Sequence, residues 1–189
     1  MRIIGGTCKG RRLAPLKGRQ TRPTQDRVRE AIFNILEGYG PFLRIMDLFA
    51  GSGAMGLEAL SRWGGEAAFI ESSREALACL SENIRRLEMK EKAFLLHRDL
   101  RRGVEFLRKS GGTYDLVFLD PPYGLGWPER IIPPLLTSGL VEESGILVLE
   151  HEAKEDHPLQ AGAWSIRDQR RYGQTKVSFY HSMKGLYLQ

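Results

Sequence analysis

The chain has 189 residues, the size of one folded domain, and its 42% apolar and 27% charged residues are ordinary for a globular protein. Its longest apolar run is the five residues from Ala76 to Leu80, far short of the about 20 that a membrane-spanning helix needs, so the membrane, collagen-like and disordered classes are excluded. The net charge of +5 comes entirely from residues 1–44, which carry ten Lys/Arg against three Asp/Glu. A basic segment joined to a nearly neutral remainder predicts a polyanionic partner such as nucleic acid, the alternative being a solvated segment without a partner.

The N-terminal segment, residues 1–19, contains short extended stretches broken by glycines, which predicts a β-hairpin or a loose arm. From Thr24, which stands in the position of an N-cap, apolar residues recur at helical spacing. The pattern predicts an amphipathic helix whose exposed face carries Arg27, Arg29 and Glu30.

Strand and helix patterns alternate along the rest of the chain. The predicted strands are Arg44–Phe49, Ala67–Ile70, Ala93–Leu96, Leu116–Leu119 and Ile146–Leu149, and the predicted helices are Ala54–Trp63, Ser73–Met89, Arg101–Lys109 and Glu129–Ser138. The strands are continuous apolar runs, which is typical of parallel sheets covered by helices on both faces. Two later strand-like runs, Trp164–Arg171 and Thr175–His181, are separated by only three residues and should therefore pair antiparallel. Ser72 and Glu75 predict a capping box at the second of these helices.

These patterns predict a doubly wound, Rossmann-like α/β fold, mostly parallel, with a C-terminal antiparallel hairpin. We divide the chain into a basic N-terminal extension, residues 1–43, and an α/β domain, residues 44–189. Cys8 and Cys79 show neither Cys-x-x-Cys nor zinc-ligand spacing, so we expect free thiols and no metal site. The N-terminus lacks the apolar stretch of a secretory signal, so we expect a cytoplasmic protein with no membrane contact.

A glycine loop follows the first of the alternating strands. Residues 51–56 read Gly-Ser-Gly-Ala-Met-Gly between a strand and a helix, and Glu71 stands twenty residues after Gly51. This spacing matches the dinucleotide fingerprint, in which glycines let the backbone approach the ligand and the acid takes the ribose hydroxyls, so an NAD enzyme is one interpretation. Asp47 next to the loop favours a cationic ligand over a pyrophosphate, and S-adenosylmethionine carries a sulfonium and an ammonium.

The tetrapeptide Asp120-Pro121-Pro122-Tyr123 comes directly after the predicted buried strand Leu116–Leu119. Ligands of open α/β sheets bind beyond the carboxyl ends of the strands, so the tetrapeptide is expected to share a crevice with the glycine loop. The Asp120 carboxylate and the Pro121 carbonyl offer two acceptors, and Tyr123 offers an aromatic ring. This combination predicts a site for a planar group that bears an exocyclic NH₂.

These segments resemble a known family. Asp-Leu-Phe-Ala-Gly-Ser-Gly at 47–53 is similar to motif I of the class I S-adenosylmethionine-dependent methyltransferases, and Asp-Pro-Pro-Tyr resembles the motif of those that methylate exocyclic amines or amides. Arg2-Ile3-Ile4-Gly5-Gly6, Lys9-Gly10-Arg11, Thr21-Arg22-Pro23-Thr24 and the stretch from Asp26 to Asn34 look like the signature of the RsmD family. Those proteins are 16S ribosomal RNA guanine-N2 methyltransferases that act at rRNA position 966.

The resemblance implies a role for each candidate residue. It implies donor-binding roles for Asp47, Gly51, Gly53, Glu71, Asp99 and Leu100, with Glu71 at the ribose hydroxyls and Asp99 at the adenine amino group. It implies catalytic roles for Asp120, Pro121 and Tyr123 at the guanine amine. The basic residues expected to contact RNA are Lys9, Arg11, Arg12, Arg19, Arg22, Arg27 and Arg29.

The resemblance also implies the reaction. The methyl donor would be S-adenosylmethionine and the product S-adenosylhomocysteine, with no metal, and the substrate would be ribosomal RNA within a small-subunit particle. We expect a monomer. Two alternatives stay open: an N6-adenine or glutamine-amide methyltransferase, which would use the same tetrapeptide, and a non-catalytic RNA-binding relative.

Overall fold

The computed structural model describes residues 1–16, 23–110 and 112–184, with residues 23–25 and 108–110 described by their backbone alone. The described residues form two compact units that divide between Arg98 and Asp99. Within the described ranges, no helix is long and apolar enough to cross a membrane.

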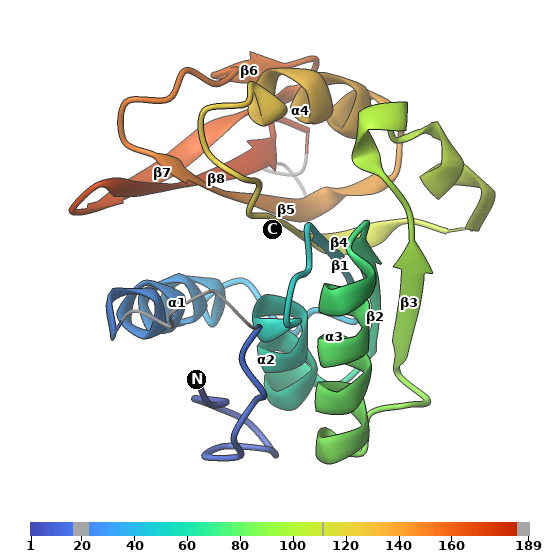
Figure 1. The fold of residues 1–189 in the computed structure, drawn as a ribbon. Helices are drawn as coiled ribbons and strands as arrows, with labels where there is room; N and C mark the ends of the chain where they lie inside the picture. Colours follow the sequence, from blue (N-terminus) through green and yellow to red (C-terminus); the bar gives the residue numbers. More distant parts are fainter. Residues whose placement is uncertain (17–22, 111, 185–189) are drawn as a thin grey trace. The chain divides into compact units, whose positions relative to one another are not determined.

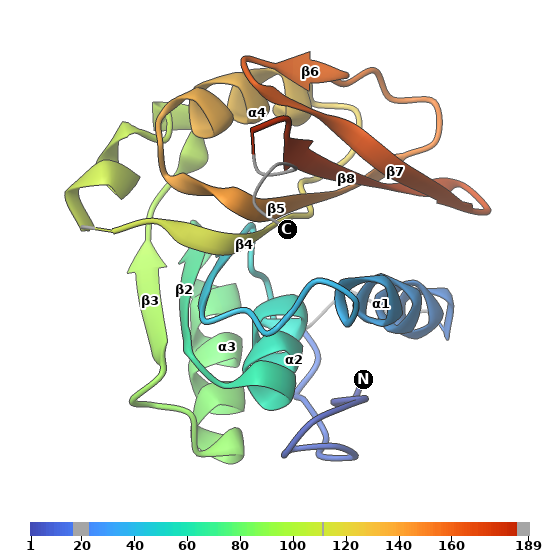
Figure 2. The ribbon, with the colours of Figure 1, turned by 180° about the vertical axis from the view of Figure 1, so that it is seen from behind.

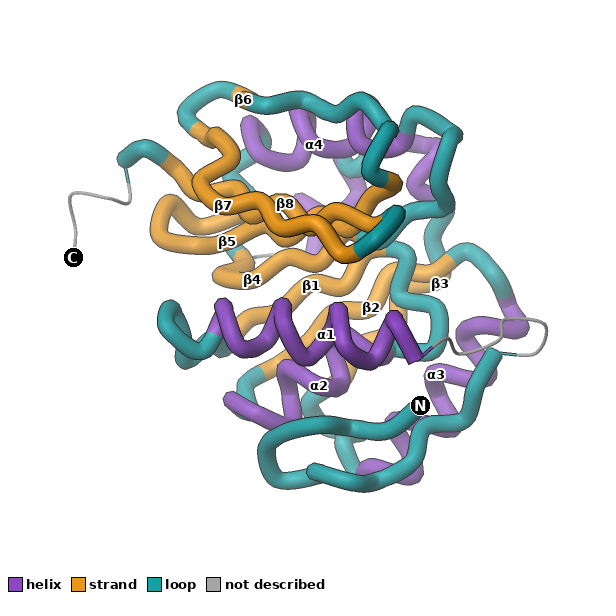
Figure 3. Tube along the Cα trace, turned by 90° about the vertical axis from the view of Figure 1, so that its left-hand side faces the viewer, coloured by secondary structure: helices purple, strands orange, loops and turns teal. Residues whose placement is uncertain are grey.

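The first unit begins with the N-terminal segment, of which residues 1–16 are described, and these residues pack against the rest of the unit. Its two extended stretches meet in one antiparallel bridge between Arg2 and Arg12, and Ile3, Cys8 and Leu13 are all buried. Helix α1 (Pro23–Leu36) follows. Because apolar side chains of the segment belong to the core, the segment is part of the folded unit (Figure 3).

Three parallel strands and two helices complete the first unit (Figure 1). The strands are β1 (Arg44–Leu48), β2 (Glu66–Glu71) and β3 (Ala93–His97), in the order β3-β2-β1, and the helices are α2 (Ala54–Trp63) and α3 (Arg74–Leu87). Helix α2 packs on β1 and β2, and α3 packs on β2 and β3. The predicted capping box is wrong by one residue, because the N-cap of α3 is Ser73, whose hydroxyl accepts a hydrogen bond from the Ala76 N–H.

The second unit contains a mixed sheet and one α-helix (Figure 2). Its elements are two 3₁₀ helices, η1 (Leu100–Arg102) and η2 (Glu105–Ser110), the helix α4 (Trp127–Thr137), and the strands β4 (Tyr114–Leu119), β5 (Val141–Glu152), β6 (Gln160–Ala161), β7 (Trp164–Tyr172) and β8 (Thr175–Ser182). The strand order is β4-β5-β8-β7-β6, with β4 parallel to β5 and the remaining pairs antiparallel.

The predicted fold class is confirmed, including the antiparallel C-terminal hairpin formed by β7 and β8. The predicted α-helix over Arg101–Lys109 is wrong, because the chain there forms η1 and η2. Gly103, with φ of +89°, ends η1 and interrupts the helical path.

Candidate active site

The glycine loop joins β1 to α2 and requires its glycines for two different reasons. Gly51 and Gly53 have φ of +57° and +81°, in the left-handed region that side chains rarely adopt. A Cβ on Gly53 would also come within 2.3 Å of Leu80, and a Cβ on Gly56 within 2.4 Å of Phe69. At Gly53 and Gly56 the backbone therefore lies too close to neighbouring side chains for a Cβ. At Gly51 the nearest contact of an added Cβ would be an ordinary 3.5 Å, so there only the backbone conformation requires glycine.

Glu71 ends β2 and lies against this loop. One carboxylate oxygen accepts a hydrogen bond from the Gly51 N–H at 2.9 Å, and the other accepts from the N–H groups of Ser72 and Ser73 at 2.7 and 2.8 Å. The side chain is half-buried. Oε1 already accepts two hydrogen bonds, whereas Oε2 accepts one and keeps a lone pair for a hydroxyl of a diol placed beside the loop. The residues present thus fit a ligand that carries a ribose.

Asp47 lies inside β1 and is 2% exposed. Its Oδ2 accepts a hydrogen bond from the Gly56 N–H at 2.9 Å, in the first turn of α2. A carboxylate at this place satisfies a free N–H of the helix N-terminus and interacts favourably with the helix dipole. Asp47 thereby fixes the start of α2, and direct contact with the donor remains a prediction.

Asp99 and Leu100 belong to the second unit. Asp99 is the N-cap of η1, where its Oδ1 accepts from the Arg101 N–H at 2.9 Å, and its carboxylate pairs with the Arg101 guanidinium at 2.6 Å. The hydrogen bonds from Arg101 hold the pKa of Asp99 below its usual value. Leu100 is buried. The contact of Asp99 with adenine and the donor contact of Leu100 both stay predictions.

The segment Asp120-Pro121-Pro122-Tyr123 follows the last residue of β4, as predicted. Pro121 is buried, Asp120 is half-buried, and the Tyr123 side chain is 41% exposed. The Tyr123 hydroxyl donates to Glu150 Oε1 at 3.2 Å and lies 3.5 Å from the Thr175 hydroxyl. The aromatic ring of the segment is therefore attached by its hydroxyl to β5 and β8.

Sequence reasoning missed Glu150. Leu119 of β4 pairs with Leu149 of β5, so Asp120 and Glu150 directly follow paired residues on adjacent parallel strands. Burial, and then the charge of Asp120, raise the pKa of the Glu150 carboxyl to about 8. One signal was visible in the sequence: Glu150 is an acid directly after the apolar run of a predicted strand, as Asp120 is.

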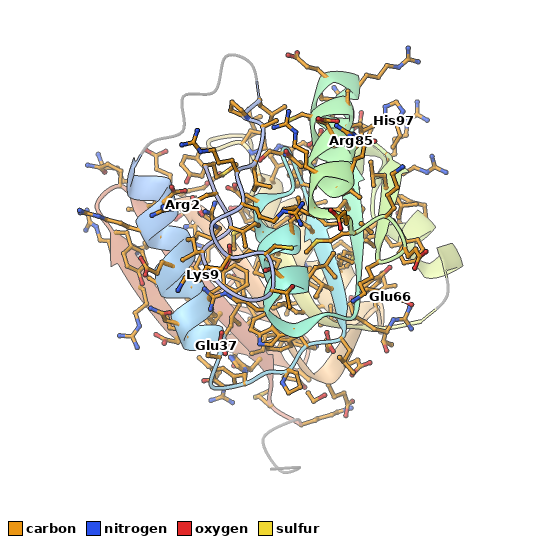
Figure 4. All side chains as sticks on the ribbon, turned by 90° about the horizontal axis from the view of Figure 1, so that it is seen from below. Arg2, Lys9, Glu37, Glu66, Arg85 and His97 are labelled. Carbon is orange, nitrogen blue, oxygen red and sulfur yellow. The ribbon has the colours of Figure 1, made fainter. Side chains whose placement is uncertain are left out.

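The predicted RNA-contacting residues fall into four groups, the last of which is Arg29 alone. Lys9, Arg12 and Arg27 are exposed, and Figure 4 shows Lys9 on the N-terminal segment. Arg11 is also at the surface, but its guanidinium donates to the Arg86 carbonyl near the end of α3 and lies 3.4 Å from Glu88. Arg19 and Arg22 lie outside the described residues.

The expected exposure of Arg29 is wrong. Arg29 is 3% exposed, and its guanidinium donates to the Arg2 carbonyl at 2.6 Å and to Asp26 at 3.1 Å. It also lies 3.9 Å from Glu58, an acid of α2 that is fully buried. Because the Arg29 guanidinium is enclosed in the protein, it is not available for a phosphate contact.

Glu58 is the second residue that sequence reasoning missed. Its two oxygens accept from the N–H groups of Ile4 and Gly5 at 2.7 Å each, and Oε1 also accepts from Arg62 Nε at 2.9 Å. These bonds fasten the basic segment to α2. The only sequence signal was a single Glu in an otherwise apolar helical face. Its partner Ile4 lies 54 positions away, so the sequence does not show the contact.

The residues described by the structure contain no group of three His, Cys, Asp or Glu that could hold a metal ion.

The fold is that of the class I methyltransferases. The solved structure of yhhF from Escherichia coli superimposes with a TM-score of 0.81 at 35% identity, covering 96% of this chain and 97% of that one. A family model described as Conserved hypothetical protein 95 matches residues 1–181, and the chain belongs to that family.

Two curated relatives span nearly the whole chain. YlbH of Bacillus subtilis (strain 168) is 36% identical over 184 residues, which cover 95% of this chain and 98% of that protein. The Escherichia coli (strain K12) protein named Ribosomal RNA small subunit methyltransferase D is 34% identical over 180 residues, which cover 95% of this chain and 89% of that protein.

Proposed function

We propose that the protein transfers a methyl group from S-adenosylmethionine to the exocyclic N2 of a guanine in small-subunit ribosomal RNA. One observation carries the proposal: Asp-Pro-Pro-Tyr follows β4 in a chain that is 34% identical, over 95% of its length, to a protein named Ribosomal RNA small subunit methyltransferase D. The reaction would take place where small subunits are made, in the cytoplasm, and the product would be S-adenosylhomocysteine.

The donor contacts are assigned mainly to the first unit. The Glu71 carboxylate would accept hydrogen bonds from the ribose hydroxyls, and the Gly51 and Gly53 backbone would lie along the methionine and ribose. Asp47 would act beside them by holding the start of α2, and Asp99 and Leu100 would contact the adenine. When bound, the donor supplies an electrophilic methyl group on a positively charged sulfur.

The acceptor contacts are assigned to the second unit. The lone pair of a guanine amine is delocalised into the ring, so the amine is a weak nucleophile. The Asp120 carboxylate and the Pro121 carbonyl would accept hydrogen bonds from the two N–H groups of the amine and so localise the lone pair on nitrogen. Tyr123 would stack on the base and orient it. The amine becomes acidic once it is methylated, so its proton can leave after transfer and Asp120 need not be a strong base.

RNA binding would involve the basic extension, residues 1–43, while residues 44–189 carry out the reaction. The exposed residues Lys9, Arg12 and Arg27 would meet phosphates, which sets register but not base identity. The target base must leave its stack to react, so we expect an unpaired or flipped nucleotide.

The test is a transfer assay with methyl-labelled donor. Small-subunit rRNA, free or within small-subunit particles, would be incubated with the protein and digested to nucleosides. Label in N2-methylguanosine supports the proposal. Label in N6-methyladenosine would identify an adenine amine as the target. Label only in an added glutamine-containing protein substrate would identify an amide as the target. The absence of label from every substrate would favour a non-catalytic RNA-binding relative.

A further inference from the structure

Three side chains of the second unit meet at the carboxyl ends of β4 and β5. Asp120 and Glu150 follow the paired residues Leu119 and Leu149, and the Tyr123 hydroxyl lies 3.2 Å from Glu150 Oε1. On the other side of Glu150 runs β8, with Val177 opposite Glu150 in the antiparallel ladder. Glu150 is thus placed between the two strands that flank it, with its carboxyl group turned to the tyrosine.

The hydrogen bond matters because packing covers only part of Tyr123. The side chain is 41% exposed, whereas Glu150 lies in a strand whose neighbours Leu149 and His151 are fully buried. The phenol oxygen lies on the axis about which χ2 turns, so holding the hydroxyl fixes χ1 and therefore the direction in which the ring extends. The Thr175 hydroxyl, at 3.5 Å, lies beside the same phenol oxygen.

We propose that Glu150 is a positioning residue that holds the Tyr123 hydroxyl and so fixes the ring on which the target base stacks. This inference rests on the proposed function, because the stacked base is the substrate of that reaction. In this role Glu150 acts through Tyr123 and not by contact with the donor or the reacting amine.

The charges of the cluster support this arrangement. Two carboxylates on adjacent strands repel each other, and the more buried one takes up a proton more readily. Burial and Asp120 raise the pKa of Glu150 to about 8, which leaves Asp120 as the charged acceptor for the amine. A protonated Glu150 still accepts the tyrosine hydrogen bond through its carbonyl oxygen.

A double-mutant cycle tests the inference. Tyr123→Phe and Glu150→Ala should each lower kcat about tenfold, the loss expected for one hydrogen bond. The double variant should lose little more than either single variant, since both remove the same bond. Glu150→Gln keeps an acceptor oxygen and should stay within about threefold of wild type, and KM for the donor should not change in any variant.

Two outcomes would overturn the inference. A Glu150→Ala variant with wild-type kcat would show that Glu150 does not contribute to the reaction. Losses that multiply to about a hundredfold in the double variant would show that Glu150 acts independently of Tyr123. Thermal unfolding of Glu150→Ala, compared with wild type and with the near-isosteric Glu150→Gln, shows whether a lower kcat comes from a folding defect.

A second measurement needs no activity. The ultraviolet titration of phenol groups, taken as wild type minus Tyr123→Phe, reports the ionisation of Tyr123. The pKa of Tyr123 is raised by burial and then by Glu150, so Glu150→Ala should move this ionisation to lower pH. An unchanged titration would overturn the inference. An inactive wild type would overturn only the proposed function.

Discussion

The carboxylate of Glu71 accepts a hydrogen bond from the backbone N–H of Gly51 at 2.9 Å, although the two residues are twenty positions apart. The bond joins the end of β2 to the loop after β1. In the proposed complex the same carboxylate meets the ribose hydroxyls, so a single acid both shapes the glycine loop and binds the donor.

Glu71→Ala should therefore weaken donor binding by about 2–3 kcal/mol, because the ribose loses a charge-assisted partner. Isothermal titration calorimetry with S-adenosylmethionine measures the change. Glu75→Ala, an exposed acid in the first turn of α3, is the matched control and should bind normally. Equal affinities of the two variants for S-adenosylmethionine would show that Glu71 does not bind the donor. Binding of NAD in place of S-adenosylmethionine would favour the dinucleotide interpretation.

Asn83 should be essential for the stability of the first unit. It is fully buried, its Oδ1 accepts from the Ala14 N–H at 2.7 Å, and its Nδ2 donates to the Ser52 carbonyl at 2.9 Å. Asn83→Ala leaves partly buried backbone groups of Ala14 and Ser52 without this partner, so we expect a loss of about 2 kcal/mol in the free energy of unfolding. Urea denaturation checks this, with exposed Asn34→Ala as control. Similar midpoints for the two variants would contradict the expectation.

The basic segment should account for part of the salt dependence of RNA binding. Replacing the exposed residues Lys9 and Arg12 by Ala should flatten the slope of log K against log salt by about 1.5 units, since two phosphate contacts are lost. Arg11 is left unchanged because it bonds the end of α3. The exposed pair Lys90 and Lys92 provides a control of equal charge. Slopes that fall equally for both pairs would mean that general charge, and not the segment, governs binding.

His151 should make the protein less stable in mild acid. It is fully buried, and burial followed by the nearby His157 lowers its pKa to about 4. The unfolded chain, with a His pKa near 6.5, binds this proton more readily, so stability is complete above about pH 6.5 and falls as the pH drops toward 4, by about 3 kcal/mol. His151→Gln should flatten that part of a stability-versus-pH curve. Exposed His97→Gln should not, and equal curves for wild type and His151→Gln would contradict the assignment.

Elements with local signals were predictable from the sequence. Helix α2 has its predicted bounds, because Gly53 and Gly64 mark its two ends, and the β7–β8 hairpin follows from two strand patterns joined by a short turn. The features that failed depend on distant partners. Arg29 was placed at the surface because nothing nearby in the sequence shows that Glu58 and the Arg2 carbonyl enclose it.

The positions of the candidate site motifs at strand ends were predictable in the same way, and the roles of their residues remain predictions. The glycine loop, Glu71 and the Asp-Pro-Pro-Tyr segment are contiguous motifs at strand ends, and the structure places each where the pattern put it. Glu150 was missed because its importance comes from the register of β4 against β5, which only the folded sheet reveals.

Asp120→Ala tests the central claim most directly. Loss of a charged acceptor at the reacting amine should raise the barrier by about 3 kcal/mol or more, so transfer to small-subunit rRNA should fall below about a hundredth of the wild-type rate while donor affinity stays within a few-fold. Formation of N2-methylguanosine and calorimetric donor binding would be measured on the same preparations. Wild-type protein that makes N2-methylguanosine, beside a variant that binds donor but does not, is the predicted result. A variant that keeps more than a tenth of wild-type turnover would contradict the account.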